Sequence, residues 1–263
     1  MVNIKTNSKY HVPNLERALE LFELLSENLQ GLTISEMSNL LNVPRNSVFR
    51  ITSTLFNHDY LNRNDELRKY TLSFKLLSIG MKALSDPALV EVALPVMHSL
   101  QNKYKETVPL GIIKGDKGVI LEEITGTHPF RFILEPGKSF NLHTSAPAKA
   151  ILAYLPKDEQ KSLLENIEYT RFTDKTIIKE QDFVRELQKV KIKGFATDHA
   201  EEIEGMHCIG APIFNRKSYP IAAIWITGPS MRIHEKEFDS IGRDVRYHAN
   251  KISKNLGFSK INT

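Results

Sequence analysis

One face of residues 45–57 is polar and suited to nucleic acid. At 100° per residue along a helix, its amide, guanidinium and hydroxyl side chains gather on one side. They are Asn46, Arg50, Ser53 and Asn57, with Ser47 and Thr54 at the margin. Such groups donate hydrogen bonds to phosphates and to base edges. An ordinary solvated helix face can look the same, so the surroundings of this segment decide its interpretation.

A second set of titratable side chains lies between residues 198 and 208. Residues of these types can act as a catalytic nucleophile with its base, or they can bind a metal ion. They are Asp198, His199, His207 and Cys208. A Cys/His pair suits a nucleophile, and a cysteine with two histidines suits a metal ion. Adjacent residues of a strand face opposite ways, however, so His207 and Cys208 cannot enter one site from a strand. A lone cysteine in an apolar strand is more often a core residue. We therefore predict neither an enzyme nor a metal site.

No other pattern indicates catalysis, a cofactor or a membrane. The chain has no phosphate-binding glycine loop and no dinucleotide fingerprint, so we expect no cofactor. Its 263 residues, net charge of +4 and single cysteine suit one small and one medium domain without a disulfide framework. Neither a signal peptide nor an apolar run of about 18 residues is present. The sequence predicts a cytoplasmic protein without membrane contact.

The elements that must position the polar face read as a helix-turn-helix. Thr33 and Glu36 have the spacing of a capping box at the start of a helix. We expect its apolar side to consist of Met37, Leu40 and Leu41. Residues 42–44 supply the turn, and Pro44 suits the first position of the next helix. That helix would pack through Val48, Ile51 and Leu55, leaving a wholly polar opposite side.

Residues 60–72 read as a β-hairpin directly after this helix, as a wing would. Its turn lies at residues 64–66, and Arg63, Arg68 and Lys69 would place cations near its tip. Residues 44–82 hold seven Lys and Arg against three Asp and Glu, a balance of +4. Residues 1–43 hold three against five, a balance of −2. The positive charge therefore lies where a polyanion would bind.

The remainder of the chain predicts a linker helix over residues 72–86 and then a mixed domain. Leu72, Leu76, Ile79 and Ala83 have helical spacing in the linker. We expect helices at 89–104, 146–155, 157–166, 180–193 and 235–256. Strands are expected at 108–113, 119–124, 130–134, 195–198, 207–214 and 220–227. Hairpins mixed with helices make this an α+β domain rather than a doubly wound sheet.

Five segments together resemble the isocitrate lyase regulator (IclR) family of bacterial transcription factors. They are NLERALELFELL, VPRNSVFRITSTL, KYTLSFKLLSIG, HTSAPAKAILA and DHAEEIEGMHCIGAPIF, which occur in the family's order between residues 14 and 258. The resemblance implies a winged helix-turn-helix over residues 1–71, a linker helix over 72–86 and a GAF-like effector-binding domain over 87–263. It also implies double-stranded operator DNA as partner and a homodimer or homotetramer.

The resemblance further implies which residues act. We expect Arg45, Asn46, Ser47, Arg50, Ser53, Arg68 and Lys69 to contact DNA. A small organic or sugar acid would be held by Ala146, Pro147, Asp198, Cys208 and Thr227, with Glu201 and Glu202 matching the family's acidic run. The first two residues lie where a small-residue turn enters a helix, whose free N–H groups can seat a carboxylate.

Two residues depart from the family pattern around the effector. Ala148 stands where a glycine is usual, and Trp225, the sole tryptophan, stands where a small hydroxyl residue is common. The period-two rule places Trp225 and Thr227 on the same side of a strand. An indole there would fill part of the site or offer one N–H donor.

Residues 170–177 and the wing passage resemble the subgroup that controls breakdown of sugar acids such as 2-keto-3-deoxygluconate. We therefore expect a repressor of a catabolic operon. The alternative is an architectural DNA-binding protein without a ligand, which calorimetry against metabolites would distinguish. A Cys/His enzyme is the weakest alternative.

Overall fold

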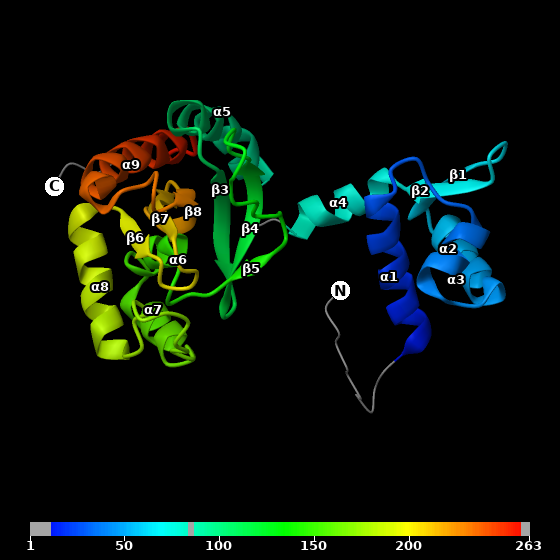
Figure 1. Ribbon diagram of the computed structural model, residues 1–263, viewed down its shortest axis with the longest axis horizontal. Coiled ribbons are helices and arrows are strands. Elements are labelled where there is room, and N and C mark those ends of the chain that lie inside the picture. Colours follow the sequence, from blue (N-terminus) through cyan, green and yellow to red (C-terminus); the bar gives the residue numbers. More distant parts are fainter. Residues whose placement is uncertain (1–11, 84–86, 259–263) are drawn as a thin grey trace. The chain divides into compact units, whose positions relative to one another are not determined.

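The computed structural model of the chain describes the backbone of residues 12–83 and 87–258 (Figure 1). It describes the side chains of these residues as well, except those that fall between residues 81 and 88. Within the described part, no helix is long and apolar enough to cross a membrane. The chain divides into two compact units, Met1–Pro87 and Ala88–Thr263.

The first unit begins with three helices, α1 (Pro13–Glu27), α2 (Ile34–Leu41) and α3 (Arg45–Asn57). The predicted capping box of α2 is confirmed, because the Thr33 side chain accepts from the Glu36 amide while Glu36 accepts from the Thr33 amide at 2.7 Å. The turn works through Asn42, whose φ of 53° lies in the left-handed region that asparagine tolerates. Helix α3 starts one residue later than predicted, with Pro44 as its N-cap.

The core of this unit joins the three helices to the hairpin. Met37 and Val48 are buried against Leu21 and Leu25 of α1. Leu40, predicted to belong to this core, is exposed, so that prediction is wrong. A helix of only eight residues buries a narrow face, and in α2 this buried face is centred on Met37.

The predicted hairpin is confirmed as β1 (Leu61–Asn64) and β2 (Lys69–Leu72), which pair antiparallel from Leu61 with Leu72 to Asn64 with Lys69. A bridge between Leu32 and Tyr70 ties β2 to the segment before α2. The turn places Arg68 at φ 52°. Helix α4 (Phe74–Ala83) follows within the segment 72–86 predicted to be helical. Leu72, expected in this helix, belongs to β2 instead, and residues 84–86 lie outside the described part of the chain.

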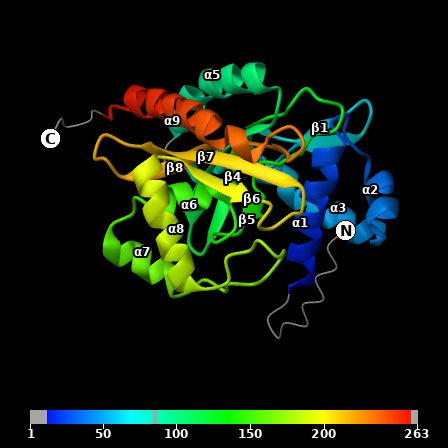
Figure 2. The same ribbon diagram turned by 60° about the vertical axis from the view of Figure 1, so that its left-hand side comes forward.

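The second unit is a six-stranded antiparallel sheet in the order β5-β4-β3-β8-β7-β6 (Figures 1 and 2). Its strands are β3 (Val108–Lys114), β4 (Lys117–Ile124), β5 (Ser139–Phe140), β6 (Ala196–His199), β7 (Met206–Phe214) and β8 (Pro220–Pro229). The mixed order of hairpins and helices confirms the α+β class.

Helices cover both faces of this sheet (Figure 2). Helices α5 (Pro87–Tyr104) and α9 (Phe238–Asn255) pack on one face, with α9 preceded by a 3₁₀ turn at Glu235–Glu237. The other face carries α6 (Ala146–Leu152), α7 (Lys157–Leu164) and α8 (Glu180–Lys193). The core spacing predicted for the last helix is confirmed, since Phe238, Ile241, Val245, Ala249 and Ile252 are all buried.

The strand predicted at residues 130–134 does not form, and β5 lies after the turn at Pro136 instead. In this segment, side chains make the backbone hydrogen bonds that a neighbouring strand would otherwise make. Thr107 donates its hydroxyl to the Phe132 carbonyl at 2.6 Å, and Glu123 accepts the Leu134 amide at 2.6 Å. Helix α6 also ends earlier than predicted, at Leu152, and a turn leads from there to Pro156.

Candidate nucleic-acid interface and ligand site

The outer side of α3 presents most of the predicted polar residues. Asn46, Arg50 and Asn57 are exposed, and Ser53 and Ser47 are half-buried. Arg45 is exposed as well, and its guanidinium donates to the Ser35 hydroxyl, which ties the start of α3 to α2. Guanidinium and amide groups therefore face outward along the first three turns of the helix.

This side of α3 is not wholly polar as predicted. Phe49 is 54 % exposed beside Arg50, and Phe56 is also exposed, with its ring edge on Tyr70 at a centroid distance of 6.4 Å. Both phenylalanines lie between the polar face and the core face of the helix, where sequence spacing alone does not decide exposure. An exposed ring beside a guanidinium is chemically suited to the methyl group of thymine.

The three cations of the wing have different surroundings. Arg68 is exposed in the turn. Arg63 is paired with Asp65 at 3.1 Å and lies over the ring of Tyr70 at 5.8 Å. Lys69 is half-buried at the start of β2, next to the turn. Its charge adds to the hydrogen bonds from Thr33 that lower the pKa of Glu36. Of the three, Arg68 therefore has the freest charge for a phosphate.

Replacing Arg68 by glycine is expected to separate charge from fold. Glycine adopts the positive φ of this turn without strain, so the free energy of unfolding should stay unchanged or rise by up to about 1 kcal/mol. DNA affinity should fall, and the slope of log K against log salt should become shallower by about one, because one phosphate contact is lost. Fluorescence anisotropy at several salt concentrations measures this slope. A wild-type slope in the variant would remove Arg68 from the interface.

In the second unit, three predicted effector residues form a row across three adjacent strands. Asp198 of β6 pairs with Cys208 of β7, and Cys208 pairs with Thr227 of β8. The Cys208 sulfur lies 3.1 Å from the Thr227 hydroxyl oxygen, and Asp198 accepts the Glu201 amide at 2.8 Å. All three residues are buried.

The other predicted effector residues converge on the same face at Gly210. A Cβ placed on Gly210 would lie 3.1 Å from the Cβ of Trp225, 3.3 Å from the Pro147 nitrogen and 3.4 Å from the Ala146 carbonyl carbon. A side chain at Gly210 would therefore require Trp225 and the start of α6 to move away from β7 by a few tenths of an ångström. The structure thus brings all six predicted effector residues onto one face of the sheet.

Trp225 occupies the centre of that face. Its side chain is 3 % exposed, and its ring lies edge-on to Phe140 at 5.6 Å. A Cβ on Gly111 would be 3.1 Å from the outer edge of the indole, so the ring extends over β3 as well. The indole fills the space beside the row where a small hydroxyl residue would leave room.

A buried lysine lies near the row of Asp198, Cys208 and Thr227, and it was not among the predicted site residues. Lys149 of α6 is fully buried, and its ammonium donates to the Glu201 carboxylate and to the Thr197 carbonyl at 2.9 Å. The second oxygen of Glu201 has no hydrogen-bond partner among the described residues. Glu202 accepts from Thr144 and, at 3.0 Å, from Asn141. Glu201 thus pairs directly with the ammonium, the charge of Lys149 also acts on Asp198, and Glu202 belongs to the cluster through Thr144 and Asn141.

Burial shifts the protonation of this cluster. It raises the pKa of Asp198 to about 6 and that of Glu201 to about 7, against the lowering effect of Lys149. Burial and the Asp198 charge raise the pKa of Cys208 well above its usual value. The thiol therefore stays neutral, whereas a nucleophile or a metal ligand needs the thiolate.

His207 faces the opposite side of the sheet from Cys208, as predicted. Its ring packs on Phe238 of α9 at 5.1 Å, while Cys208 belongs to the core under α6. Among the described residues, no three His, Cys, Asp or Glu side chains are grouped so that they could hold a metal ion.

An open polar cavity of about 280 Å³ lies next to the acidic cluster. Asn141, Leu142 and His143 form part of its wall, and the Asn141 amide joins this wall to Glu202. The His143 ring is held by the Thr170 carbonyl at 3.0 Å. None of the six predicted effector residues lines this cavity.

The first unit is a winged helix-turn-helix with exposed arginines, and the second is a separate α+β domain of the kind that binds effectors. This combination is typical of DNA-binding transcriptional regulators. Comparison with known proteins specifies the family. Residues 14–65 match the IclR helix-turn-helix domain, and residues 81–254 match the bacterial transcriptional regulator IclR C-terminal domain. The chain belongs to the IclR family. It is a DNA-binding regulator with an effector-binding domain and not an enzyme.

Individual relatives cover nearly the whole chain. The HTH-type transcriptional regulator KdgR of Escherichia coli (strain K12) is 31% identical over 225 residues, 86% of each chain. The HTH-type transcriptional repressor AllR of Salmonella typhi is 28% identical over 92% of this chain and 89% of its own. The crystal structure of Thermotoga maritima IclR superposes with a TM-score of 0.79 at 26% identity, covering 94% of this chain and 100% of that one.

Proposed function

We propose that this protein represses a catabolic operon and releases its operator when a small organic or sugar acid binds. The observation that carries the proposal is the row of Asp198, Cys208 and Thr227, which shares one sheet face with Trp225 and the start of α6. A relative named as a repressor supports the sign of regulation. We assign residues 1–71 to DNA binding, 72–86 to the linker and 87–263 to effector binding.

The effector class is supported by the resemblance to regulators of sugar-acid breakdown and by the similarity to KdgR. The buried cluster adds a physical reason. Lys149 is already engaged by Glu201, so a carboxylate ligand needs other donors. The carboxyl group of Glu201, whose pKa is raised to about 7, is partly protonated near neutral pH and can then donate its proton in a hydrogen bond. The indole of Trp225 fills part of the proposed effector site, and the smaller remaining space favours a compact acid.

We propose a homodimer that pairs through α4. Phe74 is 86 % exposed, and Leu77 and Ile79 of the same helix are also exposed. Phe74 and Leu77 share one side of this helix at i, i+3 spacing, and exposed apolar side chains grouped in this way mark a protein contact. Two copies of α3 would then read two half-sites, which multiplies the few base contacts that one short helix makes. A tetramer would require a further interface.

Arg50→Ala is expected to weaken operator binding while the fold stays intact. Arg50 is exposed in the middle of α3, so its loss removes a base or phosphate contact worth about 1–3 kcal/mol. Gel-shift titration on an operator found by in vitro selection measures the loss. Arg216→Ala, which removes an exposed arginine from the other unit, is the matched control. Wild-type affinity in the Arg50 variant would mean that α3 does not read the operator.

A further inference from the structure

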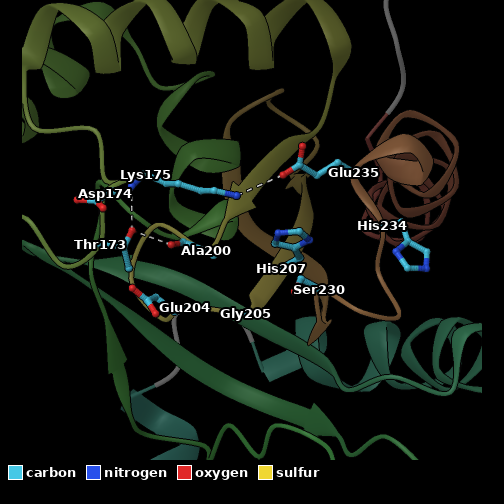
Figure 3. A pocket seen from close by; sticks show the side chains of 10 residues that line it. All are labelled: Thr173, Asp174, Lys175, Ala200, Glu204, Gly205, His207, Ser230, His234 and Glu235. Atoms are coloured by element: carbon cyan, nitrogen blue, oxygen red, sulfur yellow. Dashed lines mark hydrogen bonds and ion pairs between the residues drawn. The ribbon is translucent and has the colours of Figure 1, made fainter.

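A second cavity in the effector-binding unit, of about 520 Å³, is separate from the proposed effector site (Figure 3). Its wall comes from residues 173–175, from Ala200, Glu204, Gly205 and His207, and from Ser230, His234 and Glu235. None of the six proposed effector residues lines it. His207, which does, precedes Cys208 on β7 and so projects from the opposite face of the sheet.

His207 presents one ring nitrogen to this cavity. The side chain is 4 % exposed, and its Nδ1 lies 2.8 Å from the Ile233 carbonyl oxygen. A carbonyl only accepts, so Nδ1 carries a proton, and in the neutral ring Nε2 is an acceptor. Among the described residues, Nε2 has no hydrogen-bond partner. The hydrogen bond to Ile233 and the edge contact with the Phe238 ring together orient this acceptor.

The cavity carries more negative than positive charge. Lys175 is the only Lys or Arg in its lining, against Asp174, Glu204 and Glu235. Lys175 pairs with Glu235 at 3.4 Å, and this pair holds the pKa of Glu235 below its usual value (Figure 3). Asp174 has only a distant partner, Arg171, at 3.9 Å. Glu204 has no ion-pair partner among the described residues.

We infer that this cavity is a second ligand site, for a small ammonium compound that also carries hydroxyl groups. The ammonium group donates an N–H to Nε2 of His207, and the unbalanced carboxylates supply the counter-charge. Ser230, half-buried in the wall, offers a hydroxyl to the polar remainder of the ligand. A carboxylate ligand is disfavoured here, which separates this site from the one proposed for an organic acid.

The two sites share a loop. Ala200 lines the second cavity, and its carbonyl accepts from the Thr173 hydroxyl at 2.8 Å. The next residue, Glu201, belongs to the acidic cluster, and its carbonyl is held by Thr176 at 2.6 Å. A ligand in the second cavity therefore contacts the back of the loop that carries the acidic side chains of the proposed effector site.

Matched sugars test the inference on the full chain. Glucosamine, glucose and glucuronate share one ring size and differ in bearing a positive, neutral or negative charge, and ethanolamine, ethylene glycol and glycolate repeat the series at a smaller size. Saturation-transfer NMR and calorimetry near neutral pH should show the ammonium member of at least one series binding about tenfold more tightly than its neutral counterpart, as one hydrogen bond to a charged donor provides. The acid members can also occupy the proposed effector site, so their binding is compared only between wild type and Glu204→Lys.

Two variants locate the binding. His207→Phe keeps a ring on Phe238 but removes Nε2, and should lower ammonium affinity about tenfold, whereas His98→Phe, an exposed histidine on α5, should not. Glu204→Lys, exposed and safe for the fold, should weaken the ammonium ligand and strengthen glucuronate or glycolate. Equal binding of the ammonium and neutral members in both series, no binding of either ammonium compound, or wild-type ammonium affinity in both cavity variants would overturn the inference.

Discussion

Replacing Trp225 by serine is expected to lower the free energy of unfolding by about 3–5 kcal/mol, the usual cost of deleting a buried indole. The same change should widen the effector site, because the ring fills the face that Gly111 and Gly210 leave free. The variant should therefore accept bulkier acids than wild type. In the wild-type chain, the fluorescence of this sole tryptophan should shift when an acid binds. Thermal unfolding, calorimetry and fluorescence titration measure these effects.

Phe183→Ala is the matched control for Trp225. Phe183 is fully buried in the same core layer but lies on α8, outside the row of effector residues. This variant should lose a similar amount of stability, about 3–5 kcal/mol, and keep the wild-type ligand profile. If Trp225→Ser also melts lower with an unchanged profile, and fluorescence stays silent at saturating acid, Trp225 is a core residue only.

Replacing Lys149 by methionine is the second change with a large expected effect. It keeps the volume of the side chain but leaves the buried carboxyl groups without their cation. Breaking a buried ion pair from one side costs about 3–5 kcal/mol. Chemical unfolding at pH 8 measures this loss, and Lys189→Met, at an exposed lysine of α8, should change stability by no more than about 0.5 kcal/mol.

The effect of Lys149→Met should shrink in acid. Burial raises the pKa of Glu201 from 4.5 to about 7, so the folded chain holds this proton more tightly than the unfolded chain. The contribution of this proton to the free energy of unfolding is fully present below about pH 4.5 and is lost as the pH rises through about 7. At pH 5 Asp198 and Glu201 are largely protonated and need no cation. A loss as large at pH 5 as at pH 8 would show that Lys149 acts by packing alone.

Local patterns predicted the helix-turn-helix because each of its signals acts over a few residues. The capping box of Thr33 and Glu36, the turn at Asn42 and the β1–β2 hairpin all depend on neighbours along the chain. The row of Asp198, Cys208 and Thr227 came from the family resemblance, and the strand register then placed these residues side by side.

Lys149 shows what local patterns cannot give. A lysine among alanines reads as an ordinary surface position of a helix, yet here it is fully buried. Its burial depends on Glu201 and the Thr197 carbonyl, about 50 residues further along the chain. The missing strand at residues 130–134 has the same kind of cause, because distant side chains, Thr107 and Glu123, take its backbone hydrogen bonds.

The central claim is that an acid controls operator binding by this chain. In vitro selection with the full chain should recover a sequence with two related half-sites. Gel-shift titration on that sequence should then show that at least one acid from a panel of sugar and organic acids, 2-keto-3-deoxygluconate included, weakens binding by about 5- to 150-fold, the usual range of coupling between two sites. A recovered operator whose affinity no acid of the panel changes would contradict the account.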